Sequence, residues 1–197
     1  MKRVLRGLAV IVVSPLIASF YLCALAIGKD RSLESHSQTL SLLPGITGNY
    51  LRTAFYRFAL ESCHPSATIS FGTLFSKAAA RIEKNTYIGP HCMLGWVHLQ
   101  EDVLLGPYVQ IPSGPMTHGI ERLDVPIRLQ PGERKQITIG RDSWIGAGSI
   151  VLADVAEQNV IAAGSVVTKP TDPATINAGI PSERLKARSS PDREMGT

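Results

Sequence analysis

Aliphatic residues recur at intervals of six through most of the chain beyond residue 80. The repeating positions are Ile82, Ile88, Leu94, Leu99, Leu105, Ile111, Ile139, Ile145, Val151, Val155, Ile161 and Val167, with a slip after Leu94 and another after Val151. An α-helix repeats every 3.6 residues and a strand every two, so neither explains this spacing. One short strand plus a corner does explain it, because three such hexads complete a triangular coil. The pattern therefore predicts a mainly β protein with a parallel β-solenoid over residues 66–186.

Small residues accompany the repeat. A glycine directly follows Ile88, Ile139 and Ile145, and Ser, Thr, Ala or Val often lies four places after the aliphatic residue. We expect the glycine or other small residue to let the chain bend at each corner.

The repeat is interrupted by an extended loop at residues 112–138, which carries one histidine, His118, near its start. A solenoid cannot bury a long loop, so this segment must project from a corner. Long loops in compact folds are usually functional or disordered. Imidazole titrates close to neutral pH, which makes His118 a candidate general base.

The first part of the chain predicts a membrane anchor over residues 1–31. Residues 7–28 carry no charge and are long enough to cross the hydrocarbon core once. A signal peptide cleaved after Ala24–Ala26, a single span and a re-entrant helix all fit the composition. Basic residues lie on both sides of the segment, and Pro15 near its middle favours a break or a kink. We expect either a re-entrant or a kinked helix.

Residues 32–65 are expected to contain a linker and a short amphipathic helix. Over residues 49–62, Leu51, Ala54, Phe55 and Phe58 share one helical face, with Arg52 and Arg57 beside it. This face fits the headgroup region of a membrane, or equally the end of the solenoid, which it would cap. At the other end, residues 187–197 are typical of a polar tail.

Charge and cysteine content narrow the function classes. The net charge is +4, and the basic residues are spread along the chain, which argues against nucleic acid as the main partner. The three cysteines, Cys23, Cys63 and Cys92, show no CxxC spacing. Neither a disulfide framework nor a zinc site is indicated, and a reducing compartment fits best.

The carboxy-terminal part of the chain contains three segments in a recognisable order: "ITIGRDSWIGAGSIVLADV", "VIAAGSVVTKP" and "INAGIPSERL". In them the chain resembles the hexapeptide-repeat acyltransferases, whose domain is a left-handed parallel β-helix, and most closely those that acetylate sugars and surface polysaccharides. Two departures stand out. The segment "VAEQNV" is about two residues shorter than is usual, and Glu183 stands where the family often has Lys or Arg.

The resemblance implies a site as well as a fold. It places the catalytic histidine at His118 and implies direct acetyl transfer, with no acyl-enzyme intermediate. It also implies a homotrimer in which the long loop reaches a neighbouring subunit. Acetyl-CoA would bind between subunits, at positions matching Trp144, Ala147, Ala163, Thr168 and Lys169. Packing on the adjacent coil is an equal alternative for Trp144, as is corner geometry for Ala163 and Thr168.

Other candidate residues are weaker. His64 precedes the repeat, and His91 and His98 are expected to face outward at corners. Glu121, Asp124 or a backbone carbonyl would serve to orient His118. Arg184 and Lys186 are candidates to replace the basic residue missing at Glu183.

The sequence thus favours an acetyl-CoA-dependent O-acetyltransferase acting on a membrane-associated glycan or lipid-linked sugar. Its catalytic domain would face the cytoplasm, where acetyl-CoA is made. An N-acetyltransferase of an amino sugar, an enzyme acting on a small soluble acceptor, and a non-catalytic scaffold remain alternatives. A zinc enzyme on the same solenoid would need a second histidine five residues from His118. The two positions at that spacing hold Ser113 and Leu123, which argues against a zinc enzyme.

Overall fold

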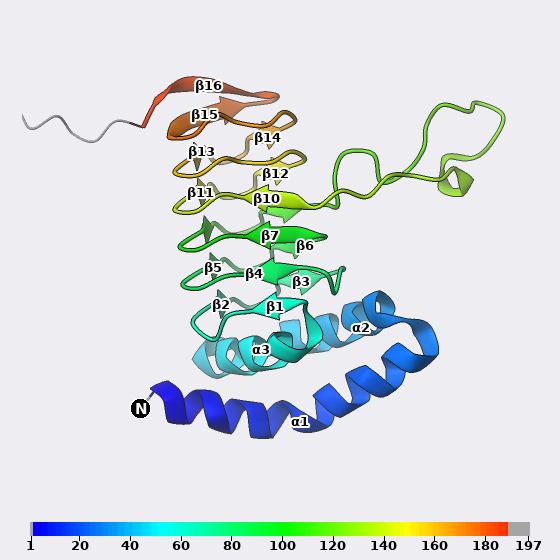
Figure 1. Cartoon of the computed structure of the whole chain (residues 1–197), viewed down its shortest axis with the longest axis vertical. Coiled ribbons are helices and arrows are strands. Elements are labelled where there is room, and N and C mark those ends of the chain that lie inside the picture. The colour runs from blue at the N-terminus through cyan, green and yellow to red at the C-terminus, as the bar shows by residue number, and fades with distance from the viewer. Residues whose placement is uncertain (1, 189–197) are drawn as a thin grey trace, which may run out of the picture.

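Three helices form a base from which a β-solenoid rises (Figure 1). The computed structural model describes residues 2–188. The helices are α1 (Lys2–Ile27), α2 (Lys29–Ser41) and α3 (Gly45–Ala59). Two of them fill much of the expected linker, and the first coil begins a few residues before the predicted start, at β1.

The solenoid has three faces, which we name A, B and C; their strands pair in parallel, except that β16 pairs antiparallel with β15. Face A contains β1 (Ser62–Cys63), β4 (Arg81–Ile82), β7 (Val97–Leu99) and β10 (Ile137–Ile139). Face B contains β2 (Thr68–Ile69), β5 (Tyr87–Ile88), β8 (Leu104–Leu105), β11 (Trp144–Ile145), β13 (Val160–Ile161), β15 (Thr175–Gly179) and β16 (Ser182–Ala187). Face C contains β3 (Leu74–Phe75), β6 (Met93–Leu94), β9 (Gln110–Ile111), β12 (Ile150–Val151) and β14 (Val166–Val167). The coils wind in the left-handed sense (Figure 1).

The predicted repeat is the solenoid's core. All twelve aliphatic positions of the repeat are buried, each with at most 2% of its surface exposed. Aligned strands stack them in register, as in the pairs Ile88–Leu105 and Leu105–Ile145. The shortened segment "VAEQNV" has a local effect, since Val155 forms a single bridge to Ile139 in place of a longer strand. Fold class and interior positions are both confirmed.

The glycines after the aliphatic residues have a different role from the one predicted. Gly89, Gly140 and Gly146 do not have the positive φ that marks a sharp bend, and a Cβ on any of them would meet backbone of the next coil within 2.7 Å. Positive φ occurs instead two or three residues later, as at His91, Asp142 and Gly148. The glycines that directly follow the aliphatic residues therefore allow adjacent coils to stack closely. They do not form the sharp turn at the corner.

Helix α3 covers the open end of the first coil, and its buried face differs from the predicted one. Phe55 and Tyr56 are buried, whereas Phe58 is partly exposed. Arg52, expected beside this face, is completely buried. Its guanidinium donates to the backbone oxygens of Leu40 (3.2 Å), Leu43 (2.6 Å) and Ile69 (2.8 Å), and to Asn49 Oδ1 (2.7 Å). The arginine thus joins the end of α2 to the first coil.

Helix α1 is continuous through Pro15, so the break that a re-entrant hairpin requires is not formed. Figure 1 shows the helix bending partway along its length. Proline removes a backbone donor and clashes with the preceding turn, which accounts for a bend within an unbroken helix.

Replacement of Arg52 by Leu should destabilise the protein strongly. The substitution leaves three buried carbonyl oxygens without their donor, at a cost of about 3 kcal/mol. For a chain of this size we expect the melting temperature to fall by about 6–12 °C. Arg57→Leu, an exposed position on the same helix, is the matched control and should change it by less than about 2 °C. Equal melting temperatures for the two variants would contradict the role of Arg52.

Candidate active site

An arm of residues 112–136 leaves the solenoid between β9 and β10 and projects from the corner between faces C and A (Figure 1). Its two legs are paired by backbone hydrogen bonds from Lys135 N to Ser113 O (2.9 Å) and from Glu133 N to Met116 O (2.7 Å). Farther out, the buried Gln130 amide bonds to the backbone N and O of Arg122 and to Val125 O. The arm also contains a short 3-10 helix, Ile127–Leu129. It is therefore a folded element, two residues shorter than the predicted loop.

His118 lies on the first leg of the arm, and its side chain is exposed. The opposite leg fixes its backbone, because a Cβ on Gly132 would lie 2.5 Å from His118 N and 2.2 Å from Thr117 O. A Cβ on Gly119 would likewise lie 2.5 Å from Pro131 O. Such close packing holds the position of the imidazole while leaving it open to solvent and to a bound molecule.

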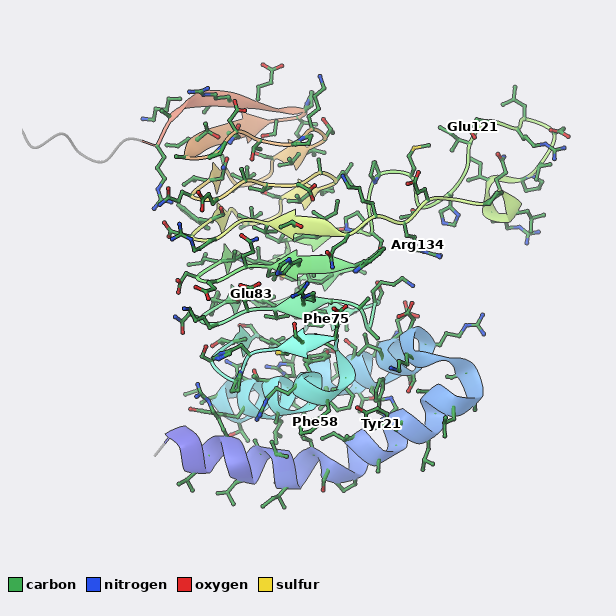
Figure 2. All side chains as sticks on the ribbon, in the orientation of Figure 1. Tyr21, Phe58, Phe75, Glu83, Glu121 and Arg134 are labelled. Carbon is green, nitrogen blue, oxygen red and sulfur yellow. The ribbon has the colours of Figure 1, made fainter. Side chains whose placement is uncertain are left out.

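A groove of about 620 Å³ lies between the base of the arm and helix α2. Its floor is the outer surface of face C, with Leu74, Met93, Gln110 and Ile150 among the lining residues. Asp30, Arg31, Glu34 and Gln38 line it from α2, and Thr117 and Arg134 from the arm. Figure 2 shows Arg134 at the base of the arm. His118 directly follows the lining residue Thr117 in sequence but does not itself line the groove.

Charged groups in the groove are held in defined positions. Asp30 accepts hydrogen bonds from Lys77 Nζ (2.7 Å) and from the backbone N–H of Ala78 (2.9 Å). Burial alone would raise the pKa of Asp30, but these bonds and the charges of Lys77 and Arg134 hold that pKa below its usual value. Asp30 is therefore a carboxylate at neutral pH, suited to accept hydrogen bonds from hydroxyl or ammonium groups.

Three of the predicted donor-binding residues lie together along face B and the corner between faces B and C. Trp144 projects from β11 with 52% of its surface exposed, beside Leu104 and Val160 of the neighbouring strands. Ala147 and Ala163 are exposed at successive levels of the corner, where Gly164 N donates to Ala147 O (2.8 Å). Within the described residues, the N–H groups of both alanines make no hydrogen bond. This corner thus has backbone N–H groups without hydrogen-bond partners on two adjacent coils.

The other two predicted residues, Thr168 and Lys169, follow β14 and are exposed at the corner between faces C and A. This is the corner from which the arm departs, two coils earlier. Within a single chain, the predicted site residues therefore lie in two separate groups. Trp144 lies on face B, with Ala147 and Ala163 at the corner between faces B and C, whereas His118, Thr168 and Lys169 lie on the side of the corner between faces C and A.

The candidate partners of His118 do not contact it. Among residues 2–188 no hydrogen bond links His118 to Glu121 or Asp124. Asp124 pairs with Arg122, whose hydrogen bond lowers the pKa of that carboxyl. Figure 2 shows Glu121 toward the far end of the arm.

The remaining histidines are placed away from the arm. His91 is at a corner, as expected, and stacks on Tyr108 with ring centroids 5.1 Å apart. The prediction for His98 was wrong in detail, because His98 lies within β7 and not at a corner. It bonds to Glu83 at 2.6 Å. Glu183 is exposed on β16, and the nearby Arg184 pairs with Asp172 at 3.6 Å.

Sequence reasoning missed the groove residues Asp30, Lys77, Thr117 and Arg134. They come from α2, from the first coil and from both legs of the arm, and no local motif marks them. Only the fold brings them together.

Comparison with known proteins gives the same fold. The chain is 22% identical to the galactoside O-acetyltransferase of Escherichia coli (strain K12) over 178 residues, covering 76% of this chain and 84% of the relative. A maltose O-acetyltransferase from Clostridium difficile 630 superposes with a TM-score of 0.68 at 20% identity, covering 82% of this chain and 89% of that one. No family model matches the chain.

A third similarity is to a mutant of AntD, an N-acyltransferase from Bacillus cereus, in complex with coenzyme A and dTDP-4-amino-4,6-dideoxyglucose. Its TM-score is 0.56 at 17% identity, covering 66% of this chain and 74% of AntD. The coil repeat, its carboxy-terminal segments and these relatives define an acyltransferase. In fold and in repeat pattern the chain is similar to the hexapeptide-repeat acyltransferases.

Substitution of Gly132 by Ala tests the packing behind His118. The new Cβ meets Thr117 O and His118 N, so the first leg must shift. We expect acyl transfer, measured as CoA release, to fall at least tenfold, because small displacements of a catalytic group are costly. The melting temperature should change by only a few degrees, since the arm lies outside the core. Gly7→Ala, where a Cβ meets nothing within 4 Å, is the control. Unchanged turnover in Gly132→Ala would contradict the idea that this packing positions the histidine.

Proposed function

We propose that the chain is an acetyl-CoA-dependent O-acetyltransferase whose acceptor is a hydroxyl of a membrane-associated glycan or lipid-linked sugar. The observation that carries this proposal is the arm, which holds a solvent-open histidine next to a polar groove. Sugar acetylation is the activity named for the Escherichia coli and Clostridium relatives.

The groove supports a sugar as acceptor. It combines a carboxylate at Asp30, guanidinium groups at Arg31 and Arg134, and the amides of Gln38 and Gln110, above a floor that includes Met93 and Ile150. Convergent polar groups over an apolar surface are typical of sites that bind polyhydroxylated ligands. Thr117, which lines this groove, directly precedes His118 in the chain.

Backbone N–H groups without hydrogen-bond partners at the corner between faces B and C support a pantetheine-bearing donor. The arm of acetyl-CoA is extended and rich in amides, and the unpaired N–H groups at Ala147 and Ala163 suit such a chain. The small side chains of Ala147 and Ala163 would allow the pantetheine to approach this corner closely. Lys169 is exposed and suits a phosphate contact. The neighbouring AntD structure contains coenzyme A.

His118 would act as the general base. Its imidazole takes the proton from the acceptor hydroxyl, the oxygen attacks the thioester carbonyl, and the C–S bond breaks. The proton then passes from the imidazole to the departing thiolate. Transfer is direct, and Cys63 and Cys92 suit no nucleophilic role because burial raises their pKa to about 12 and about 11.

A homotrimer would complete the site. In one chain the two halves of the predicted site lie at opposite edges of face C, so the edge of one protomer must meet the opposite edge of the next. The arm offers an apolar contact for this assembly at Ile120, Leu123, Ile127 and Leu129, and Leu123 is fully exposed. Exposed aliphatic residues of this kind are typical of subunit interfaces.

The compartment follows from the donor. Acetyl-CoA is a cytosolic metabolite, so the solenoid and arm should lie on the cytoplasmic side of the membrane to which α1 is attached. One helix of the described chain, Val4–Ile27, is long and apolar enough to cross a membrane, which is weak support for membrane association.

His118→Ala tests the chemistry. We expect turnover with acetyl-CoA and sugar acceptors to fall about 10²–10⁴-fold, while binding of CoA, measured by calorimetry, stays unchanged. His64→Ala, an exposed histidine of the first coil, should keep full turnover. Testing matched hydroxy and amino sugars in the same assay separates O-acetylation from N-acetylation. Preserved turnover in His118→Ala would remove the histidine from the mechanism, and no CoA release with any acceptor would favour a scaffold.

Ala163→Trp tests the donor groove. A large side chain at this exposed corner should block the pantetheine and raise the KM for acetyl-CoA roughly tenfold or more, with a smaller effect on the KM for the acceptor. Ala187→Trp, at an exposed position of β16, is the control. If the two variants have the same KM for acetyl-CoA, the donor does not bind along this corner.

A further inference from the structure

The outward side of α1 is apolar along its length. Val4, Leu8, Ile11, Val12, Leu22 and Leu25 are all exposed, Leu25 to 87%. Within Val4–Ile27, an 18-residue window has a mean hydropathy of 2.4, and only 11% of its residues are buried. Water does not favour such a surface, so a partner of matching chemistry must cover it.

The inward side of α1 is fixed to the other two helices. Ala9, Val13 and Phe20 are buried there. Ser32 Oγ donates to Phe20 O (2.8 Å), Tyr21 OH donates to Phe58 O (2.8 Å), and His36 Nε2 bonds to Ser19 Oγ (3.2 Å). A helix that left this position to cross a bilayer would break these bonds and uncover the buried residues. The packing therefore favours a helix that stays on the base.

The direction of α1 agrees with this packing. Figure 1 shows the helix running across the base, transverse to the axis along which the coils stack. With one face on protein and the opposite face apolar and exposed, such a helix suits the boundary between headgroups and hydrocarbon.

The helical part of the chain also carries its excess positive charge. Residues 1–59 contain seven Lys and Arg and two Asp and Glu, whereas the rest of the chain has 13 basic and 14 acidic residues. Of the seven, Arg52 is buried and engaged within the protein. A segment that combines a net positive charge with an exposed apolar face is complementary to an anionic lipid surface.

A cavity of about 240 Å³ opens between α1, α3 and the first coil. Arg6 and Arg57 line it together with Asn49, Tyr50, Thr53 and Ser66, and no acidic residue is among its lining residues. Among residues 2–188, neither arginine forms an ion pair. Two guanidinium groups with hydroxyl and amide groups between them match the oxygens of a phosphate.

We propose that the base is a monotopic docking surface for an anionic bilayer. Helix α1 lies in the plane of the headgroup–hydrocarbon boundary, and the Arg6–Arg57 cavity takes the phosphate of an anionic phospholipid. This inference rests on the membrane location within the proposed function, but lipid binding tests it without reference to acetyl transfer.

Vesicle co-sedimentation of the full chain tests the headgroup site. An Arg6→Gln, Arg57→Gln variant should bind vesicles of phosphatidylcholine with phosphatidylglycerol about 30-fold more weakly than the unmodified chain, at roughly fivefold per arginine. Binding to pure phosphatidylcholine should change less than about twofold. Arg128→Gln, an exposed arginine of the arm, is the control. Turnover on a soluble acceptor should be unaffected by all three substitutions.

Equal loss with Arg128→Gln, or equal loss on both kinds of vesicle, would overturn the headgroup site. Inorganic phosphate at millimolar concentration should not release the protein from anionic vesicles, because the apolar face of α1 stays inserted. Full release by free phosphate would show an anion site without membrane docking, which contradicts the proposal.

Spin labels test the orientation of α1. Single cysteines replace Ile11 or Leu22 in a Cys23→Ser background, and their depths are read from collision with lipid-soluble and water-soluble relaxing agents. In-plane docking predicts similar, shallow depths for both positions. A spanning helix would separate them by about 16 Å along the membrane normal. Unequal depths of that size would overturn the in-plane helix even if anionic binding persists.

Discussion

A buried guanidinium without a carboxylate partner joins the helical base to the solenoid. Arg52 bonds to Leu40 O and Leu43 O near the carboxyl end of α2 and to Ile69 O of the first coil. The negative end of a helix dipole and three carbonyl oxygens replace a counter-ion. Burial lowers the pKa of Arg52, yet a guanidinium stays charged at neutral pH. Helices and coils are consequently one rigid unit, and the arm has a fixed relation to α1.

The solenoid could be predicted from sequence because its interior obeys a one-dimensional rule. Each coil contacts only its neighbours, so burial at Ile88, Leu105 or Ile145 depends on spacing alone. The same logic located the arm, since an interruption of the repeat has to leave the stack. What spacing could not reveal was the reason for each glycine, because close contact between coils and a sharp turn favour the same residue.

The helical base was harder to predict because its packing is three-dimensional. The amphipathic pattern placed Phe58 on the apolar face and Arg52 beside it, whereas in the structure Phe58 is exposed and Arg52 is buried. A hydrophobicity pattern treats arginine as polar, although a cluster of unpaired carbonyl oxygens makes its burial favourable. The groove poses the same difficulty, since Asp30 and Arg134 are about a hundred residues apart. His118 also lies apart from Ala147 and Ala163 in the single chain, and the residue spacing gave no sign of this separation.

Because the coils stack regularly, the height of any point on the solenoid is proportional to the number of coils below it. Strands of adjacent coils are spaced by about 4.8 Å, so the arm, which leaves the third coil, stands about 10 Å above the first one. The number of coils before the interruption therefore sets how far His118 lies from the helical base. A solenoid with one coil more or fewer below the arm would hold the arm about 4.8 Å farther from the base or nearer to it.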